Sequence, residues 1–315
     1  MKTKVLIVDK IFKRGKEWEQ VLRQKFPEVL ISGVSNEDEI GDFIEEAEIL
    51  VTHGISDELI KKASKLQWLQ GMGTGVDRIL TPSLRKEVLV TSSRGIHGPQ
   101  MSEMAILLML SLNRDIPHLI RNQDQRIWER RPGRLLHQKK VGIFGVGVIG
   151  EELARKCKAF GMTVFGIDIV RREIDSIDLF YGPEDLIQVA KEVDYLVLVA
   201  PYTPETRKII GSKVLASMKP SAFLINIARG ELVDNEALIE ALEAGKIAGA
   251  ALDALHPEPL PKDHPLWGTK NVIITSHVGG MSDIYMEQIL PIFEENLRRF
   301  LSGERRNLVN FIERG

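Results

Sequence analysis

The sequence has very little cysteine and no long apolar run, and both absences narrow the kinds of protein it can encode. Its 315 residues include a single cysteine, Cys157, which excludes an internal disulfide framework and a cysteine metal cluster and fits a reducing compartment. The longest apolar segment, MAILLMLSL, is far too short to span a bilayer. The chain opens on MKTKVLIVDK, which leads directly into a predicted strand without the layout of a signal peptide. We therefore expect a cytoplasmic protein with no membrane role and no metal site.

The sequence also lacks an excess of charge of either sign. Its 42 Lys and Arg residues against 44 Asp and Glu residues leave a formal net charge of −2, so no general attraction to nucleic acid is expected. One stretch, residues 121–140, is locally basic, and we interpret it as a solvated connecting arm because it carries no nucleic-acid-binding motif. The hydrophobic content of 43% and the length of 315 residues favour two globular domains.

Short β-branched runs alternate with amphipathic helical stretches along most of the chain. Strands are predicted in two series, at residues 4–9, 29–33, 48–54, 66–72 and 87–93, and, after a long helical segment, at 140–144, 162–168, 194–200, 222–228, 247–254 and 271–277. Helices are predicted between them, including 35–48 and 56–65, and a final amphipathic helix over 283–303 is expected to be interrupted or kinked at Pro291. Such alternation is typical of parallel strands joined by crossover helices, so the predicted fold class is α/β with doubly wound parallel sheets.

The segment VGIFGVGVIG carries Gly145, Gly147 and Gly150 in the spacing G-x-G-x-x-G. That spacing alone is weak evidence, but it follows a β-branched strand and opens a helix, and the next strand ends at Asp168, eighteen residues after Gly150. These are the parts that hold a dinucleotide, because the glycines allow the backbone to approach the pyrophosphate and the start of the helix meets its charge. Asp168 would accept hydrogen bonds from the ribose hydroxyls and repel a 2′-phosphate, which predicts NAD and makes NADP less favoured.

Alternatives stay open at this point. Arg171 and Arg172 lie close to Asp168 in the sequence and would soften the preference against a 2′-phosphate. A methyltransferase also holds a ribose with an acidic residue after a glycine loop, and a plain glycine turn beside a surface aspartate is the structural alternative. Further polar residues are needed to separate these classes.

Three polar residues follow strands of the second series, at the edge where an open parallel sheet binds its ligand. Arg229 follows LINIA, Glu258 lies in a proline-rich loop after the strand that ends at Asp253, and His277 ends the last strand. Each has a structural explanation by itself, as a surface ion pair, a solvated loop acid or a core histidine. Together they match the needs of ketone reduction. An arginine binds the substrate carboxylate and stabilises the developing alkoxide, a histidine donates the proton, and a carboxylate of the protein orients the histidine. A methyltransferase has no need for all three.

These motifs resemble those of the D-isomer-specific 2-hydroxyacid dehydrogenases over nearly the whole chain. The likeness is carried by GMGTGVDRI (71–79), GIHGPQMSEMAI (95–106), VGIFGVGVIG (141–150), PYTPETRKIIG (201–211), NIARGELVD (226–234), AALDALHPEPLPKDHPLW (250–267) and NVIITSHVGG (271–280). The resemblance implies two Rossmann-like domains. A discontinuous, flavodoxin-like substrate domain would comprise residues 1–97 and 283–315, and an NAD-binding Rossmann domain would comprise residues 98–282. It also implies a homodimer joined through the NAD domains and the arm around residues 110–130.

The resemblance further implies roles for particular residues. Arg229 would bind the substrate carboxylate and carbonyl, Glu258 would orient the histidine, and His277 would be the acid/base for hydride transfer between NAD(H) and a small 2-keto or D-2-hydroxy acid. Backbone amides around Gly73, Thr74 and Gly75 would hold the substrate carboxylate. The residues expected to line the cofactor site are Gly145, Gly147, Val148, Ile149, Gly150, Asp168, Pro201, Thr206, Ile227, Ala228, Asp253, Gly279 and Gly280, with Asp253 near the nicotinamide amide.

Some positions depart from the family pattern. Ser276 stands where the family usually has proline, and ALHPEP replaces a loop start that more usually contains an aromatic and an acidic residue. Neither change removes a catalytic group. Glu258 argues against formate as the substrate, because the formate dehydrogenase branch typically has glutamine there. No C-terminal regulatory extension is expected. Glyoxylate, hydroxypyruvate and 3-phosphoglycerate-type substrates all stay open, and so does a dinucleotide-sensing corepressor or scaffold on the same fold.

Overall fold

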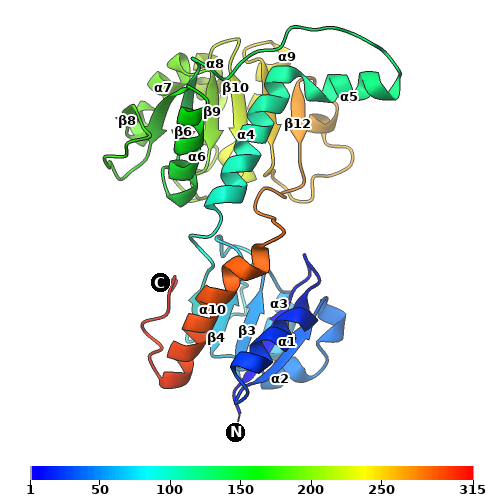
Figure 1. Ribbon diagram of the computed structural model, residues 1–315, viewed down its shortest axis with the longest axis vertical. Coiled ribbons are helices and arrows are strands. Elements are labelled where there is room, and N and C mark those ends of the chain that lie inside the picture. Colours follow the sequence, from blue (N-terminus) through cyan, green and yellow to red (C-terminus); the bar gives the residue numbers. More distant parts are fainter. Residues whose placement is uncertain (1, 315) are drawn as a thin grey trace. The chain divides into compact units, whose positions relative to one another are not determined.

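The computed structural model describes residues 2–314, which divide into two compact units (Figure 1). The first unit comprises the chain up to Ile96 together with the chain from Ser282 onward, and the second unit is His97–Met281. The first unit is therefore discontinuous in sequence, and each unit has its own parallel sheet and its own core. Along the described chain, no helix is both long and apolar enough to cross a membrane.

The first unit is a five-stranded parallel sheet with helices on both faces (Figure 1). Its elements are β1 (Lys4–Val8), α1 (Gly15–Lys25), β2 (Leu30–Val34), α2 (Phe43–Glu46), β3 (Ile49–Thr52), α3 (Asp57–Lys62), β4 (Trp68–Gly71), β5 (Leu89–Thr91) and α10 (Tyr285–Ser302). The strand order is β2-β1-β3-β4-β5. Successive side chains of β1 point to opposite faces, so Val5 and Ile7 pack with α1 and α10, whereas Leu6 and Val8 pack with α2 and α3.

The second unit is a seven-stranded parallel sheet in the order β12-β11-β10-β9-β6-β7-β8. Its strands are β6 (Lys140–Phe144), β7 (Thr163–Ile167), β8 (Leu179–Tyr181), β9 (Tyr195–Leu198), β10 (Phe223–Asn226), β11 (Gly249–Leu252) and β12 (Val272–Ile274). Its helices are α4 (Gly98–Arg114), α5 (Ile116–Asp124), α6 (Val148–Ala159), α7 (Leu186–Glu192), α8 (Ser212–Ser217) and α9 (Asn235–Glu243). The helices α7, α8 and α9 bury apolar residues against one face, and α4 and α6 cover the other.

The predicted fold class, two doubly wound parallel α/β sheets, is confirmed, but some expected elements differ. The single helix expected over 35–48 is wrong, because a short 3-10 helix capped by Asn36 and the helix α2 are separated at Gly41, which has a left-handed φ of 56°. The long helical segment divides into α4 and α5 at Asp115, where φ is 51°. Conversely, α10 continues through Pro291 without interruption. The strand β8 was not expected from the sequence.

Candidate active site

The carboxyl ends of β10, β11 and β12 lie next to one another, because the three strands are parallel neighbours in the second sheet. The segments that follow these strands contain Arg229, Asp253, Glu258 and His277. A doubly wound sheet places its ligands at this edge. The fold therefore brings the polar residues singled out in the sequence into one region of one unit.

His277 and Glu258 form a direct pair. The Nδ1 atom of His277 lies 2.9 Å from both carboxylate oxygens of Glu258, and both side chains are half-buried. A carboxylate at Nδ1 accepts the proton that this nitrogen carries, which leaves Nε2 to exchange a proton with a substrate. Glu258 is itself held by the amide of Leu255, which donates to Oε1 at 3.0 Å. The pair thus fixes the orientation of the imidazole and favours the tautomer that carries its proton on Nδ1.

Asp253 holds the turn that carries His277. Its carboxylate is buried and accepts hydrogen bonds from the hydroxyl of Thr275 at 2.6 Å and from the amides of Val278 at 3.0 Å and Gly279 at 2.9 Å. His277 lies between these donors with a left-handed φ of 56°, a conformation that most residues rarely adopt. Three hydrogen bonds to one carboxylate therefore stabilise the unusual backbone of the histidine.

Two residues at and just after the carboxyl end of β10 allow the segment that contains Arg229 to pack against the loop that contains Glu258. Asn226 is fully buried, and its side-chain amide donates to the carbonyls of Arg229 at 2.9 Å and Ala254 at 3.3 Å. A Cβ on Gly230 would lie 1.9 Å from the carbonyl carbon of Leu255, so only glycine allows this approach. Arg229 is half-buried, and its Nη1 donates to the carbonyl of Ala228 at 2.8 Å. Sequence reasoning missed Asn226, although a polar residue closing an apolar strand was a visible signal.

The glycine loop after β6 has a different requirement at each glycine. Gly145 has φ 102°, and a Cβ there would lie 2.4 Å from the amide nitrogen of Ala200. A Cβ on Gly150 would lie 2.1 Å from the carbonyl oxygen of Gly145. Around Gly147, at the start of α6, nothing lies within 4 Å of the Cβ position. The outer glycines therefore close the turn, and the middle one leaves backbone open to a ligand.

Asp168 joins this loop from the end of β7. Its Oδ2 accepts a hydrogen bond from the amide of Val146 at 2.6 Å, and its Oδ1 accepts one from Val170 at 3.1 Å. Arg172 also contacts the loop, because its Nη2 donates to the carbonyl of Val146. The carboxylate and the guanidinium thus lie beside the same segment.

The remaining expected residues are placed as follows. Thr206 donates to the carbonyl of Pro201 at 3.0 Å and closes the loop after β9. The buried residues Ile227 and Ala228 follow β10, Val148 and Ile149 open α6, and Gly279 and Gly280 follow His277. The turn Gly73, Thr74 and Gly75 follows β4 in the first unit, and the carbonyl of Gly73 accepts a hydrogen bond from the amide of Ser93 at 2.9 Å.

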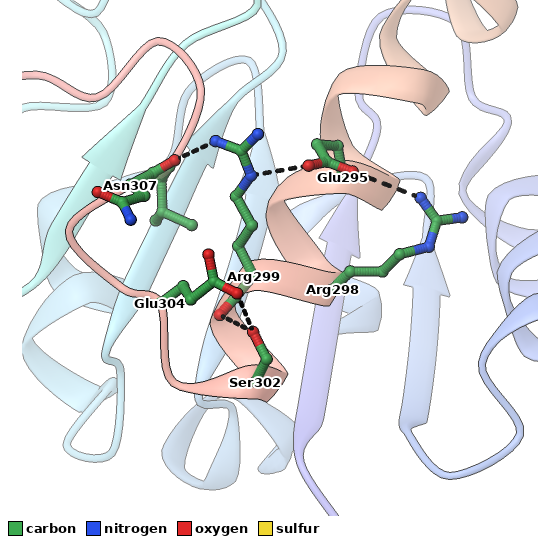
Figure 2. A pocket seen from close by; sticks show the side chains of 7 residues that line it. Glu295, Arg298, Arg299, Ser302, Glu304 and Asn307 are labelled. Carbon is green, nitrogen blue, oxygen red and sulfur yellow. Dashed lines mark hydrogen bonds and ion pairs between the residues drawn. The ribbon is translucent and has the colours of Figure 1, made fainter.

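A separate hollow lies at the C-terminal end of α10 (Figure 2). Its two arginines are already paired, since Arg299 donates to Glu295 at 2.7 Å and Arg298 lies 3.8 Å from the same carboxylate. Arg299 also donates to the carbonyl of Asn307. The hollow therefore offers no uncompensated positive charge to an anion.

Comparison with known proteins defines the class to which this fold and site belong. Residues 106–279 match the family model described as D-isomer specific 2-hydroxyacid dehydrogenase, NAD binding domain, and the chain belongs to this family. It is 34% identical to a D-3-phosphoglycerate dehydrogenase of Methanocaldococcus jannaschii over 90% of this chain and 55% of that protein, so it spans about half the length of that relative. It is 32% identical to a glyoxylate reductase of Korarchaeum cryptofilum over 83% of this chain and 81% of that one.

Solved structures agree with this family. A D-isomer specific 2-hydroxyacid dehydrogenase family protein from Aeromonas salmonicida superposes with a TM-score of 0.91 at 33% identity, covering 99% of each chain. An acyclic imino acid reductase in complex with NADPH and D-Arg superposes with a TM-score of 0.83 at 27% identity, covering 99% of this chain and 100% of that one.

Proposed function

We propose that the protein is an NAD-dependent reductase of small 2-keto acids that forms D-2-hydroxy acids. The observation that carries this proposal is the His277–Glu258 pair at 2.9 Å, on a turn held by Asp253 in the same unit as the glycine loop. Relatives named glyoxylate reductase and D-3-phosphoglycerate dehydrogenase support this reaction class.

The glycine loop fits a dinucleotide. The open backbone at Gly147 and the first amides of α6, at Val148 and Ile149, would hold the pyrophosphate, because the start of a helix favours negative charge. Asp168 would bind the ribose, and Pro201, Thr206, Ile227, Ala228, Asp253, Gly279 and Gly280 would line the rest of the site. When bound, the reduced nicotinamide supplies the hydride.

The chain's own residues would then bind the keto acid and supply the proton. Arg229 would hold the carboxylate and polarise the 2-keto oxygen, because a guanidinium offers paired donors and positive charge to a developing alkoxide. His277 would donate the proton from Nε2 to that oxygen while Glu258 stabilises the positive imidazole. The turn at Gly73, Thr74 and Gly75 would hold the carboxylate with backbone amides. In this assignment the first unit is the substrate domain and the second is the NAD domain.

Asp168 favours NAD over NADP in this proposal. Its carboxylate lies beside the glycine loop, where a 2′-phosphate would meet like charge. Arg172 contacts the carbonyl of Val146 in the same loop and would lessen that repulsion. Because a similar structure holds NADPH, both cofactors belong in the test.

We further propose that the protein is a cytoplasmic homodimer. The helix α5 and the arm after it expose several large apolar side chains, and Trp128 is 90% exposed. Such side chains on one segment are typical of a surface that a second copy covers. The others are Ile116, Leu119, Ile120 and Ile127.

The function is tested by following oxidation of NADH and of NADPH with glyoxylate, pyruvate and hydroxypyruvate. We expect turnover with NADH, abolished by His277→Ala. A matched control is His256→Ala, since His256 also pairs with a glutamate, Glu231 at 3.2 Å, but is largely exposed and is expected to leave the rate unchanged. Binding of NADH without turnover of any keto acid would contradict the enzyme and favour a dinucleotide-sensing protein on this fold.

A further inference from the structure

One buried side chain at the carboxyl end of β10 is hydrogen-bonded to two loops of the candidate active site. Asn226 is the last residue of β10, and its Nδ2 donates to the carbonyl oxygens of Arg229 at 2.9 Å and Ala254 at 3.3 Å. Its Oδ1 accepts a hydrogen bond from the amide of Ala228 at 3.0 Å. A carboxamide has two N–H groups to donate, and here they go to two different loops.

The hydrogen bond to Ala254 reaches Glu258 through a single peptide group. The carbonyl of Ala254 and the amide of Leu255 belong to the same planar unit. Asn226 donates to that carbonyl, and the amide donates to Oε1 of Glu258 at 3.0 Å. Hydrogen bonds in such a chain polarise and strengthen one another. Asn226 therefore supports, through one peptide, the carboxylate that pairs with His277.

The hydrogen bond to Arg229 holds the other loop against the same peptide. The Oδ1 of Asn226 accepts from the amide two residues on, so the chain turns directly after the strand. The carbonyl of Arg229 is then held by Nδ2, and Gly230 packs so closely on Leu255 that a Cβ would lie 1.9 Å from its carbonyl carbon. The two loops thus share one carboxamide and one close backbone contact.

Packing alone does not explain an asparagine at this position. The residues before it in β10 are Phe223, Leu224 and Ile225, all apolar and buried. An apolar side chain would continue this core without any polar partner, whereas a buried carboxamide is destabilising unless its hydrogen bonds are made. What Asn226 adds is therefore the fixed position of the two carbonyls to which it donates.

We propose that Asn226 is a positioning residue for keto-acid reduction, because it holds the loops of Arg229 and Glu258 in one fixed relative position. This inference rests on the proposed reductase function. In that function Arg229 binds the keto acid and Glu258 orients His277. The substrate oxygen meets the proton donor only while the two loops keep their relative position.

Two substitutions separate the link between the loops from the local turn. Asn226→Ser keeps an oxygen that accepts from the amide of Ala228, but its side chain is too short to donate to the carbonyls of Arg229 and Ala254. Asn226→Ala removes all three hydrogen bonds. Both are expected to lower kcat/KM for glyoxylate by about 100-fold, through a fall in kcat and a rise in KM. The NADH affinity of Asn226→Ser is expected to stay within about threefold of the wild type, because the turn is kept.

A double-mutant cycle tests whether Asn226 acts through Glu258. In a protein that already carries Glu258→Gln, Asn226→Ser is expected to lower kcat by less than about threefold further, because the carboxylate that it supports is absent. The rise in KM is expected to persist in this background, since the loop of Arg229 is still released. A residue that only stabilises the fold would lower kcat equally in both backgrounds.

Asn113→Ala is the matched control for stability. Asn113 is also a buried asparagine of the second unit, and its Oδ1 accepts a hydrogen bond from the hydroxyl of Tyr195 at 2.5 Å. Tyr195 begins β9, a parallel neighbour of β10, so this contact lies at the opposite edge of the sheet from Asn226. Asn113→Ala is expected to lower the thermal midpoint and to leave kcat and KM for glyoxylate unchanged.

The outcomes separate the role of Asn226 from the reductase function. Wild-type kinetics in Asn226→Ser, with losses in Asn226→Ala alone, would overturn the link between the loops and leave only the local turn. Equal losses of kcat in the wild-type and Glu258→Gln backgrounds would overturn the action through Glu258. Because Asn226→Ser keeps the turn, it carries the test even if Asn226→Ala does not fold. A wild-type protein that reduces no keto acid would overturn the reductase function, and the role of Asn226 with it.

Discussion

Replacing Asp253 by asparagine tests whether its carboxylate holds the turn of His277. The carboxylate accepts hydrogen bonds from Thr275, Val278 and Gly279 on its two oxygens. An asparagine has one oxygen and one amide group, so its amide must face an N–H or O–H donor whichever way it is turned. At least one buried hydrogen bond to a charged acceptor is then lost, which costs about 1.5–3 kcal/mol.

That loss is expected in both stability and rate. For a unit of this size, it corresponds to a fall of about 3–12 °C in the thermal midpoint. Because the left-handed backbone of His277 depends on the same bonds, kcat is expected to fall by about 10- to 100-fold, as for a displaced catalytic group. The assays are differential scanning calorimetry and steady-state reduction of glyoxylate.

Thr275→Val provides the graded control for this substitution. It removes one donor and leaves both amide hydrogen bonds to Asp253 in place, so it is expected to cost less than Asp253→Asn in both assays. If Asp253→Asn kept its midpoint and its kcat within twofold of the wild type, the carboxylate would not be what positions His277.

Three further predictions follow from the structure. Glu258→Gln is expected to lower kcat by about 10²- to 10³-fold with little change in NADH affinity, because the amide cannot stabilise a protonated His277. Steady-state rates measure kcat, and fluorescence titration measures NADH affinity. Equal losses in kcat and in NADH affinity would contradict this role of Glu258. The pKa of His53 is lowered by burial to about 4 from its ordinary 6.5, so the unfolded state binds the proton first. The contribution of neutral His53 to the free energy of unfolding is therefore fully present above about pH 6.5 and is lost as the pH falls through about 4. The free energy of unfolding should change by about 3 kcal/mol over this range, which urea unfolding at several pH values measures. The variant His53→Leu should not show this change. Ser276→Pro is expected to keep more than about a third of the activity, because the amide of Ser276 makes no hydrogen bond among residues 2–314. Loss of activity with an intact thermal midpoint would instead show that this position controls the backbone of His277.

Much of the fold follows from local patterns that a sequence displays directly. Strand and helix periods, glycine after helices and β-branched runs are properties of neighbouring residues, so the α/β class was predictable. The helix expected over 35–48 was wrong for a local reason as well, since Gly41 adopts a left-handed conformation that its neighbours did not signal. The strand β8 depends on pairing with β7, which no local pattern encodes.

The candidate site, like the fold, was predictable from the sequence only in part. Residue type and position after a strand singled out Arg229, Glu258 and His277, because parallel strand ends converge whatever their detailed packing. The 2.9 Å contact between His277 and Glu258 joins residues 19 apart through the path of an irregular loop, and only the folded chain shows it.

The sequence by itself determined the class of fold, the glycine loop with its carboxylate, and the chemical groups offered at the edge of the second sheet. These depend on residue identity and on spacing along the chain. Only the tertiary structure decided that Asp253 binds three donors around His277 and that the ring nitrogens of His53, beside Asp9 and Tyr285, are buried with no hydrogen bond among residues 2–314. The physical reason is that burial and hydrogen bonding depend on distances between segments far apart in the chain, and those distances exist only once the sheets have formed.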